Sequence, residues 1–152
     1  MRIEVFTKDE FDRESKNISE SFFSFSQIKG NIKFSKIYDI KAEEKEEYFK
    51  KIAEDILVDP VVEYYILGEK TPRPFNFNVS IEVWFKKGVT DVVGESVKNI
   101  IGVYGMRMPD DAQSARCYYF SLKADKNILK EFIYENFANE LINDIRLRLK
   151  KD

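Results

Sequence analysis

The chain has 152 residues, 43% of them hydrophobic, and its 25 basic and 27 acidic residues leave a formal net charge of −2. Such a mixed surface creates no long-range field for phosphate backbones, so nucleic acid is not an expected partner. With no histidine and a single cysteine, Cys117, the chain cannot assemble a Cys-His nucleophile or a conventional zinc site, and no metal or cofactor is expected. No apolar run is long enough to span a membrane, and residues 1–5 have a strand pattern instead of a signal peptide, which indicates a cytoplasmic location without a membrane partner.

The first half of the chain predicts strand, helix, long strand, helix and strand. The strand over residues 3–8 alternates apolar residues with Glu4, which is typical of a half-buried strand. The further elements are a helix over 10–28, a long strand or bent hairpin over 32–42, a helix over 43–59 and a strand over 61–67. The apolar parity slips between Phe34 and Ile37, which suggests a bulge or bend in the long strand.

The segment after the last of these strands divides the chain. It contains Thr71-Pro72-Arg73-Pro74, a stiff stretch with few backbone donors of the kind that separates modules. We therefore expect one module at residues 1–68, a linker at 69–75 and a second module at 76–152.

The second half repeats the order of elements. We expect a strand over 78–86, a loop over 87–91, a helix over 92–104, a loop over 105–113, a strand over 115–123, a helix over 126–139 and a strand over 141–149. The last strand alternates apolar residues with Arg146, Arg148 and Lys150, whose charges protect an edge strand from pairing with other chains.

Short sequence matches support two copies of one unit. Ile3-Glu4-Val5 and Lys8 return 78 residues later as Ile81-Glu82-Val83 and Lys86, and Ile40-Lys41-Ala42 returns 82 residues later as Leu122-Lys123-Ala124. Repeats of this length are whole modules. The fold expected is therefore α+β, with two tandem modules and antiparallel sheets. Each module is ferredoxin-like if its long strand is a hairpin, and each is too small to be stable alone.

The loop that opens the second module carries the strongest local signal. Its residues predict a glycine turn followed by Thr90 or Asp91 as the N-cap of a helix. The loop lacks the spacing of a phosphate-binding loop. Capping and turn formation leave Lys86 and Lys87 without a structural role, and loops on a rigid scaffold are where contacts concentrate.

Other segments have a structural and a functional interpretation. Residues 22–25 (Phe-Phe-Ser-Phe) read as core with one exposed ring, or as a docking surface. Asp110 and Asp111 suggest paired acidic catalysts or a magnesium site, but also an ordinary solvated loop. Cys117 reads as a small buried hydrophobic residue, and Trp84 as an aromatic anchor in the core or between the modules.

Residues 80–95 resemble the opening of PurS, the small subunit of phosphoribosylformylglycinamidine synthase. In that family a strand is followed by Lys-Pro-Gly-Val, an Asp two residues later and a Gly three residues after that. Here Lys87 replaces the proline, while Gly88, Val89, Asp91 and Gly94 match. Two such modules in tandem are similar to the N-terminal region of the long synthase (PurL) polypeptides, which looks like a PurS dimer fused into one chain.

The resemblance implies an accessory, non-catalytic part of that purine-biosynthesis enzyme, an ATP- and glutamine-dependent C–N ligase. This part would bridge the synthetase (PurL) and glutaminase (PurQ) parts. The expected interface is the loop at residues 86–94, with the residues Lys86, Lys87, Gly88, Val89, Thr90, Asp91 and Gly94. Two alternatives stay open: a free-standing tandem ferredoxin-like regulatory module that binds a small metabolite between its halves, and a small enzyme that uses carboxylates alone.

Overall fold

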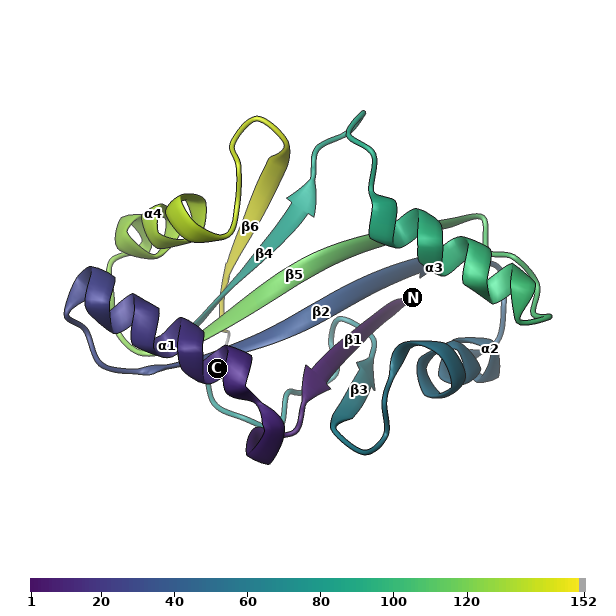
Figure 1. Cartoon of the computed structure of the whole chain (residues 1–152), viewed down its shortest axis with the longest axis horizontal. Coiled ribbons are helices and arrows are strands. Elements are labelled where there is room, and N and C mark those ends of the chain that lie inside the picture. The colour runs from purple at the N-terminus through teal and green to yellow at the C-terminus, as the bar shows by residue number, and fades with distance from the viewer. Residues whose placement is uncertain (151–152) are drawn as a thin grey trace. The chain divides into compact units, whose positions relative to one another are not determined.

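A computed structural model describes residues 1–150 of the chain, which form an α+β fold around an antiparallel sheet (Figure 1). The strands are β1 (Arg2–Thr7), β2 (Asn31–Lys41), β3 (Glu63–Leu67), β4 (Val79–Phe85), β5 (Asp111–Ser121) and β6 (Asn143–Leu149). The α-helices are α1 (Arg13–Ser26), α2 (Glu46–Ile52), α3 (Val92–Val103) and α4 (Lys126–Asn136). The strand order is β3-β1-β2-β5-β4-β6. The α+β class and the antiparallel sheet predicted from the sequence are confirmed.

The described residues group into two compact units that interleave along the chain. Unit 1 contains Met1–Phe11, Ser35–Arg73 and Thr90–Ala115, and therefore holds β1, β3, α2 and α3. Unit 2 contains Asp12–Phe34, Pro74–Val89 and the chain from Arg116 on, and holds α1, β4, α4 and β6. The long strands β2 and β5 each contribute residues to both units. The predicted modules at residues 1–68 and 76–152, with a linker at 69–75, stay a prediction.

The core of unit 1 forms on the face of β1 that carries Ile3 and Val5, because side chains two residues apart in a strand point to the same side. Ile3 and Val5 are buried against Phe49 and Ile52 of α2 and against Val97 and Ile101 of α3. Strand β1 pairs antiparallel with β2 on one side and with β3 on the other. The unit thus buries one apolar face of its strands under two amphipathic helices, the usual solution for a sheet of this kind.

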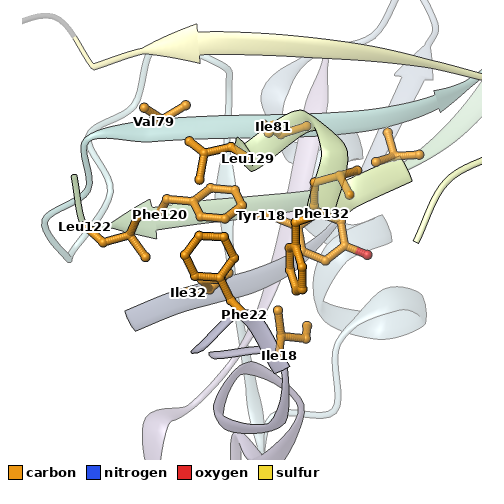
Figure 2. Close-up of a cluster of buried hydrophobic side chains, with 12 residues drawn as sticks. Ile18, Phe22, Ile32, Val79, Ile81, Tyr118, Phe120, Leu122, Leu129 and Phe132 are labelled. Atoms are coloured by element: carbon orange, nitrogen blue, oxygen red, sulfur yellow. The ribbon is translucent and has the colours of Figure 1, made fainter. Parts of the chain in front are cut away.

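The core of unit 2 is rich in aromatic rings (Figure 2). Phe22 of α1 packs edge-on against Phe120 of β5 at 5.8 Å and Phe132 of α4 at 5.0 Å between ring centroids. Figure 2 also shows Ile81 of β4 and Leu129 of α4 close to these rings. Because aromatic side chains bury large areas, this cluster accounts for much of the hydrophobic stabilisation of unit 2.

Strand β2 is one continuous strand over Asn31–Lys41, so the bent hairpin that the sequence suggested is wrong. Its pairing with β1 runs without interruption from Arg2↔Asp39 to Phe6↔Ser35. Tyr38 and Ile40 pack with the core of unit 1, whereas Ile37 is buried on the opposite face. Both faces of this strand are therefore covered, which accounts for the slip in apolar parity.

Several helix and strand limits differ from the sequence prediction. The helix predicted over 43–59 begins only at Glu46, and after Ile52 it continues as a π-helix, Ala53–Leu57. A 3-10 helix, Asp9–Phe11, precedes α1, which ends at Ser26 because Gln27 adopts a left-handed conformation with φ 61°. Helix α4 ends at Asn136 instead of 139, and β6 begins at Asn143 instead of 141. Strand β5 begins at Asp111, inside the loop predicted over 105–113.

Candidate partner interface

The first part of the predicted interface loop, residues 86–89, belongs to unit 2. The backbone N–H of Lys86 donates to the carbonyl of Ile142 at 2.8 Å, and Val89 N–H closes a turn on the carbonyl of Lys86 at 3.0 Å. Gly88 has φ 89°, a conformation that glycine adopts far more readily than other residues. Lys87 is exposed beside this turn, so its ammonium group is available to a partner.

The second part of the loop belongs to unit 1 and caps α3. Asp91, not Thr90, is the N-cap: its Oδ1 accepts from the N–H of Gly94 at 2.9 Å and from Ser114 Oγ at 2.7 Å. Its Oδ2 accepts from the N–H of Ser114 at 2.6 Å. A Cβ at position 94 would run into the carbonyl oxygen of Ala112, so the helix approaches β5 closely only because residue 94 is glycine. The side chain of Asp91 therefore fixes both the start of α3 and its position on β5.

An equivalent cap in the first half was missed by the sequence analysis. Asp12 caps α1, and its Oδ1 accepts from the N–H of Ser15 at 3.0 Å. Its Oδ2 accepts from Ser15 Oγ at 2.6 Å and pairs with Lys33 Nζ at 2.5 Å. Ser15 Oγ in turn accepts from the N–H of Phe34. The spacing Asp-x-x-Ser at the start of a helix was the available signal.

The outward face of α3 carries four exposed apolar side chains, with the exposed polar residues Ser96 and Asn99 among them. Val92, Ile100 and Val103 lie on one side of the helix and are 67%, 50% and 89% exposed, and Val93 beside them is 49% exposed. The outward face of α4, in contrast, carries Lys130, Glu131 and Glu135. Apolar side chains that gather on the surface mark contact sites in many proteins. Val92 and Val93 also belong to the loop and helix start that the sequence pattern singled out.

Two glutamates of the repeated tripeptide are buried, although the strand pattern predicted only half-buried strands. In unit 1 Glu4 is fully buried, and its Oε1 pairs with Arg73 Nη2 at 2.6 Å while its Oε2 accepts from Ser35 Oγ at 2.5 Å. Arg73 comes from the segment that was predicted to be a plain linker. That segment therefore covers part of the second face of the strands in unit 1, and the pair satisfies the buried carboxylate.

In unit 2 the corresponding Glu82 is 2% exposed and accepts from Trp84 Nε1 at 2.9 Å. The guanidinium of Arg146 lies 4.7 Å from the ring centroid of Trp84, a cation–π contact. Trp84 is therefore a buried aromatic anchor, as the sequence predicted, and its ring N–H has a hydrogen-bond partner. Glu82 is held in the strand by its neighbours and is not presented to solvent.

The other residues that the sequence singled out lie in the core or in backbone contacts of the fold. Phe22 is core, while Phe23 and Phe25 are partly exposed, and the ring of Phe25 lies 5.5 Å from that of Phe132. Cys117 is buried, which confirms the prediction of a small hydrophobic residue. The backbone N–H of Asp110 donates to the carbonyl of Lys41, and the next residue, Asp111, opens β5.

Within residues 1–150 no group of three or more Cys, Asp or Glu side chains is arranged to hold a metal ion. None of the helices in this range is long and apolar enough to cross a membrane. Comparisons with protein-family models and with curated proteins found no significant match for the chain.

Proposed function

We propose that this chain is an accessory, PurS-like part of a phosphoribosylformylglycinamidine synthase, where it bridges the synthetase and glutaminase parts without performing the chemistry itself. The observation that carries the proposal is the loop at residues 86–94, in which three of the four family-like residues have a geometric role. Gly88 takes a positive φ, Asp91 caps α3 and Gly94 allows α3 to approach β5. A shared motif whose residues are needed by the local geometry supports a shared local fold.

The strand order supports the finer proposal of two tandem modules. Read outwards from its centre, the sheet gives β2, β1 and β3 in one direction and β5, β4 and β6 in the other. These are the second, first and third strands of each half of the sequence. Such an order is what two copies of one βαβαβ module joined through their long strands would produce, as in a fused PurS-like dimer.

Turn formation and capping account for Gly88, Asp91 and Gly94 but leave other residues of the segment unexplained. Lys87 is exposed, and Val92 and Val93 direct apolar side chains to solvent at the start of α3. We assign these residues, together with Ile100 and Val103, to contact with the synthetase part. Exposed apolar side chains gathered with Ser96 and Asn99 on one helix face fit a partner surface with few charges, because desolvating charged groups opposite them would be unfavourable.

The test is binding of the purified chain to the synthetase protein of the same organism, measured by calorimetry. Lys87→Glu and Val103→Lys should each weaken binding at least tenfold, while the melting temperature stays nearly unchanged, because exposed substitutions shift stability by only about 0.5 kcal/mol. Lys130→Glu on the exposed face of α4 is the matched control and should bind like the wild type. Loss of stability without loss of binding would assign the segment to folding, and unchanged binding in both variants would place the interface elsewhere.

A further inference from the structure

Strand β3 lies at one edge of the sheet and exposes part of its backbone to pairing. It pairs with β1 in regular register from Ile3↔Leu67 to Thr7↔Glu63. The backbone N–H of Lys8 donates to the carbonyl of Val62, and the N–H of Gly68 donates to the carbonyl of Arg2. Residues of even number in β3 therefore turn their N–H and C=O groups towards β1. In an antiparallel ladder these directions alternate, so Glu63, Tyr65 and Leu67 direct theirs to the open edge.

Local turns use two of these outward groups. The N–H of Glu63 donates to the carbonyl of Asp59 at 2.8 Å, and the carbonyl of Leu67 accepts from Thr71 Oγ1. Four groups remain directed at the edge: the N–H groups of Tyr65 and Leu67 and the carbonyls of Glu63 and Tyr65. These two donors and two acceptors are self-complementary: when two copies of the strand lie antiparallel, each donor of one copy faces an acceptor of the other.

The two edge strands, β3 and β6, differ in how well their side chains prevent pairing with another chain. Strand β6 alternates its apolar residues with Asp144, Arg146 and Arg148, and such charges discourage pairing with another chain. Strand β3 has the sequence Glu-Tyr-Tyr-Ile-Leu, without lysine, arginine or proline, and its pairing with β1 shows no bulge. Its side chains are all half-buried, so the strand presents aromatic and aliphatic groups at an edge.

We propose that β3 pairs antiparallel with β3 of a second copy of this chain, about a twofold axis at Tyr65. In this register Tyr65 faces Tyr65 of the second copy, and each donates its N–H to the carbonyl of the other. The N–H of Leu67 donates to the carbonyl of Glu63 of the second copy, and by symmetry the N–H of Leu67 of the second copy donates to the carbonyl of Glu63 of the first. All four outward groups of each strand are then satisfied.

Side chains select the same register. Glu63 lies opposite Leu67, and Tyr64 lies opposite Ile66, an aromatic and β-branched pair that stabilises antiparallel strands. A slip of two residues in one direction would set Glu63 opposite Glu69, and like charges directly opposite each other are destabilising. A slip in the other direction would set Leu67 opposite Val61, outside the strand, and would leave outward groups without partners. The inference concerns unit 1 alone and does not depend on the proposed function.

Sedimentation of the purified chain over a range of concentrations tests the association. The wild type should show a concentration-dependent monomer–dimer equilibrium. Tyr65→Lys should be a folded monomer, because the lysine can pair with Glu54, which now accepts from Tyr65 Oη at 2.7 Å, but would meet a second lysine at the twofold axis. Ile145→Lys, at the equivalent place on β6, and Tyr65→Phe should still dimerise. A wild type that is monomeric throughout, or a Tyr65→Lys variant that dimerises like the wild type, would overturn the proposal.

A disulfide experiment tests the register. Hydrogen-bonded antiparallel neighbours have Cα atoms about 5.5 Å apart, within the range of a disulfide. Tyr65→Cys should therefore form a cross-linked dimer on oxidation, whereas Glu63→Cys should not, because its two copies would lie about 13 Å apart along the strands. Cys117 is buried and should not interfere. Equal cross-linking of both variants would contradict the twofold axis at Tyr65.

Discussion

Arg73 Nη2 lies 2.6 Å from Glu4 Oε1, in a pair whose side chains are only 6% and 0% exposed. The pair joins the segment after β3 to the middle of β1. A carboxylate in such a place is tolerated only if it is paired and hydrogen-bonded, and Ser35 Oγ supplies the second contact. The segment between the two halves of the sequence therefore takes part in the folded structure of unit 1.

The first prediction concerns this pair. Arg73→Met should lower the free energy of unfolding by about 3–5 kcal/mol, because the Glu4 carboxylate would lose its ion pair with Arg73 while it stays buried. The double variant Glu4→Gln/Arg73→Met should recover part of the loss. Urea unfolding at neutral pH measures the free energy of unfolding of the wild type, the single variant and the double variant.

The exposed pair of Arg107 and Glu44, 3.3 Å apart, supplies a matched control. Arg107→Met should change stability by less than about 1 kcal/mol, as is usual for surface ion pairs. Equal effects of the two arginine substitutions would show that burial of the Glu4–Arg73 pair has no energetic consequence.

The sequence predicted the type and order of the main elements but not what covers them. Alternation identified β1 and β4, yet it could not show that Glu4 and Glu82 are buried, because the side chains that enclose Glu4 include Arg73, 69 positions away. The slip in apolar parity in β2 likewise reflects cover on both faces of the strand, which distant segments supply and which the local sequence does not show. Asp91 was one of two predicted caps, whereas Asp12 was overlooked because the glycine turn that drew attention to the second loop is missing from the first.

The second prediction separates two glycines of α3. Gly94→Ala should destabilise the chain by about 1–3 kcal/mol, because its Cβ would meet the rigid backbone of Ala112. Gly102→Ala should be neutral or stabilising by up to about 1 kcal/mol, since the nearest atom is the flexible end of Met108 and alanine favours helices. Chemical unfolding of both variants decides the matter, and a Gly94→Ala protein as stable as the wild type would show that the close approach to β5 is not needed.

The third prediction concerns the helix caps. Asp91→Ala and Asp12→Ala should each reduce stability by about 1–2 kcal/mol, the usual range for a lost N-cap. Thr90→Ala should change it by no more than about 0.5 kcal/mol, because Thr90 is exposed and Asp91 makes the cap. If Thr90→Ala were the more damaging of the two loop substitutions in a thermal melt, the assignment of the cap would have to be reversed.

The fourth prediction is a loss of stability in alkali. Burial raises the pKa of Tyr118 from 10.0 to about 12, although Arg116 acts in the opposite direction. Between these values the unfolded chain has lost a proton that the folded chain keeps, so stability is full below pH 10 and falls as the pH rises towards 12. The contribution of Tyr118 is about 2–3 kcal/mol over this window. Unfolding measured from pH 9 to 11 should show a shallower decline in Tyr118→Phe, and an identical slope in both proteins would contradict the assignment.

Reconstitution of the synthase reaction tests the proposed function most directly. Synthetase and glutaminase proteins of the same organism are mixed with formylglycinamide ribonucleotide, ATP and glutamine, with and without this chain, and amidine formation is followed. We expect glutamine-dependent turnover to require the chain, to be weakened by Val103→Lys and to be unaffected by Lys130→Glu, while the chain alone hydrolyses neither glutamine nor ATP. Turnover that is the same with and without the chain, together with no complex between the three proteins, would contradict the bridging role.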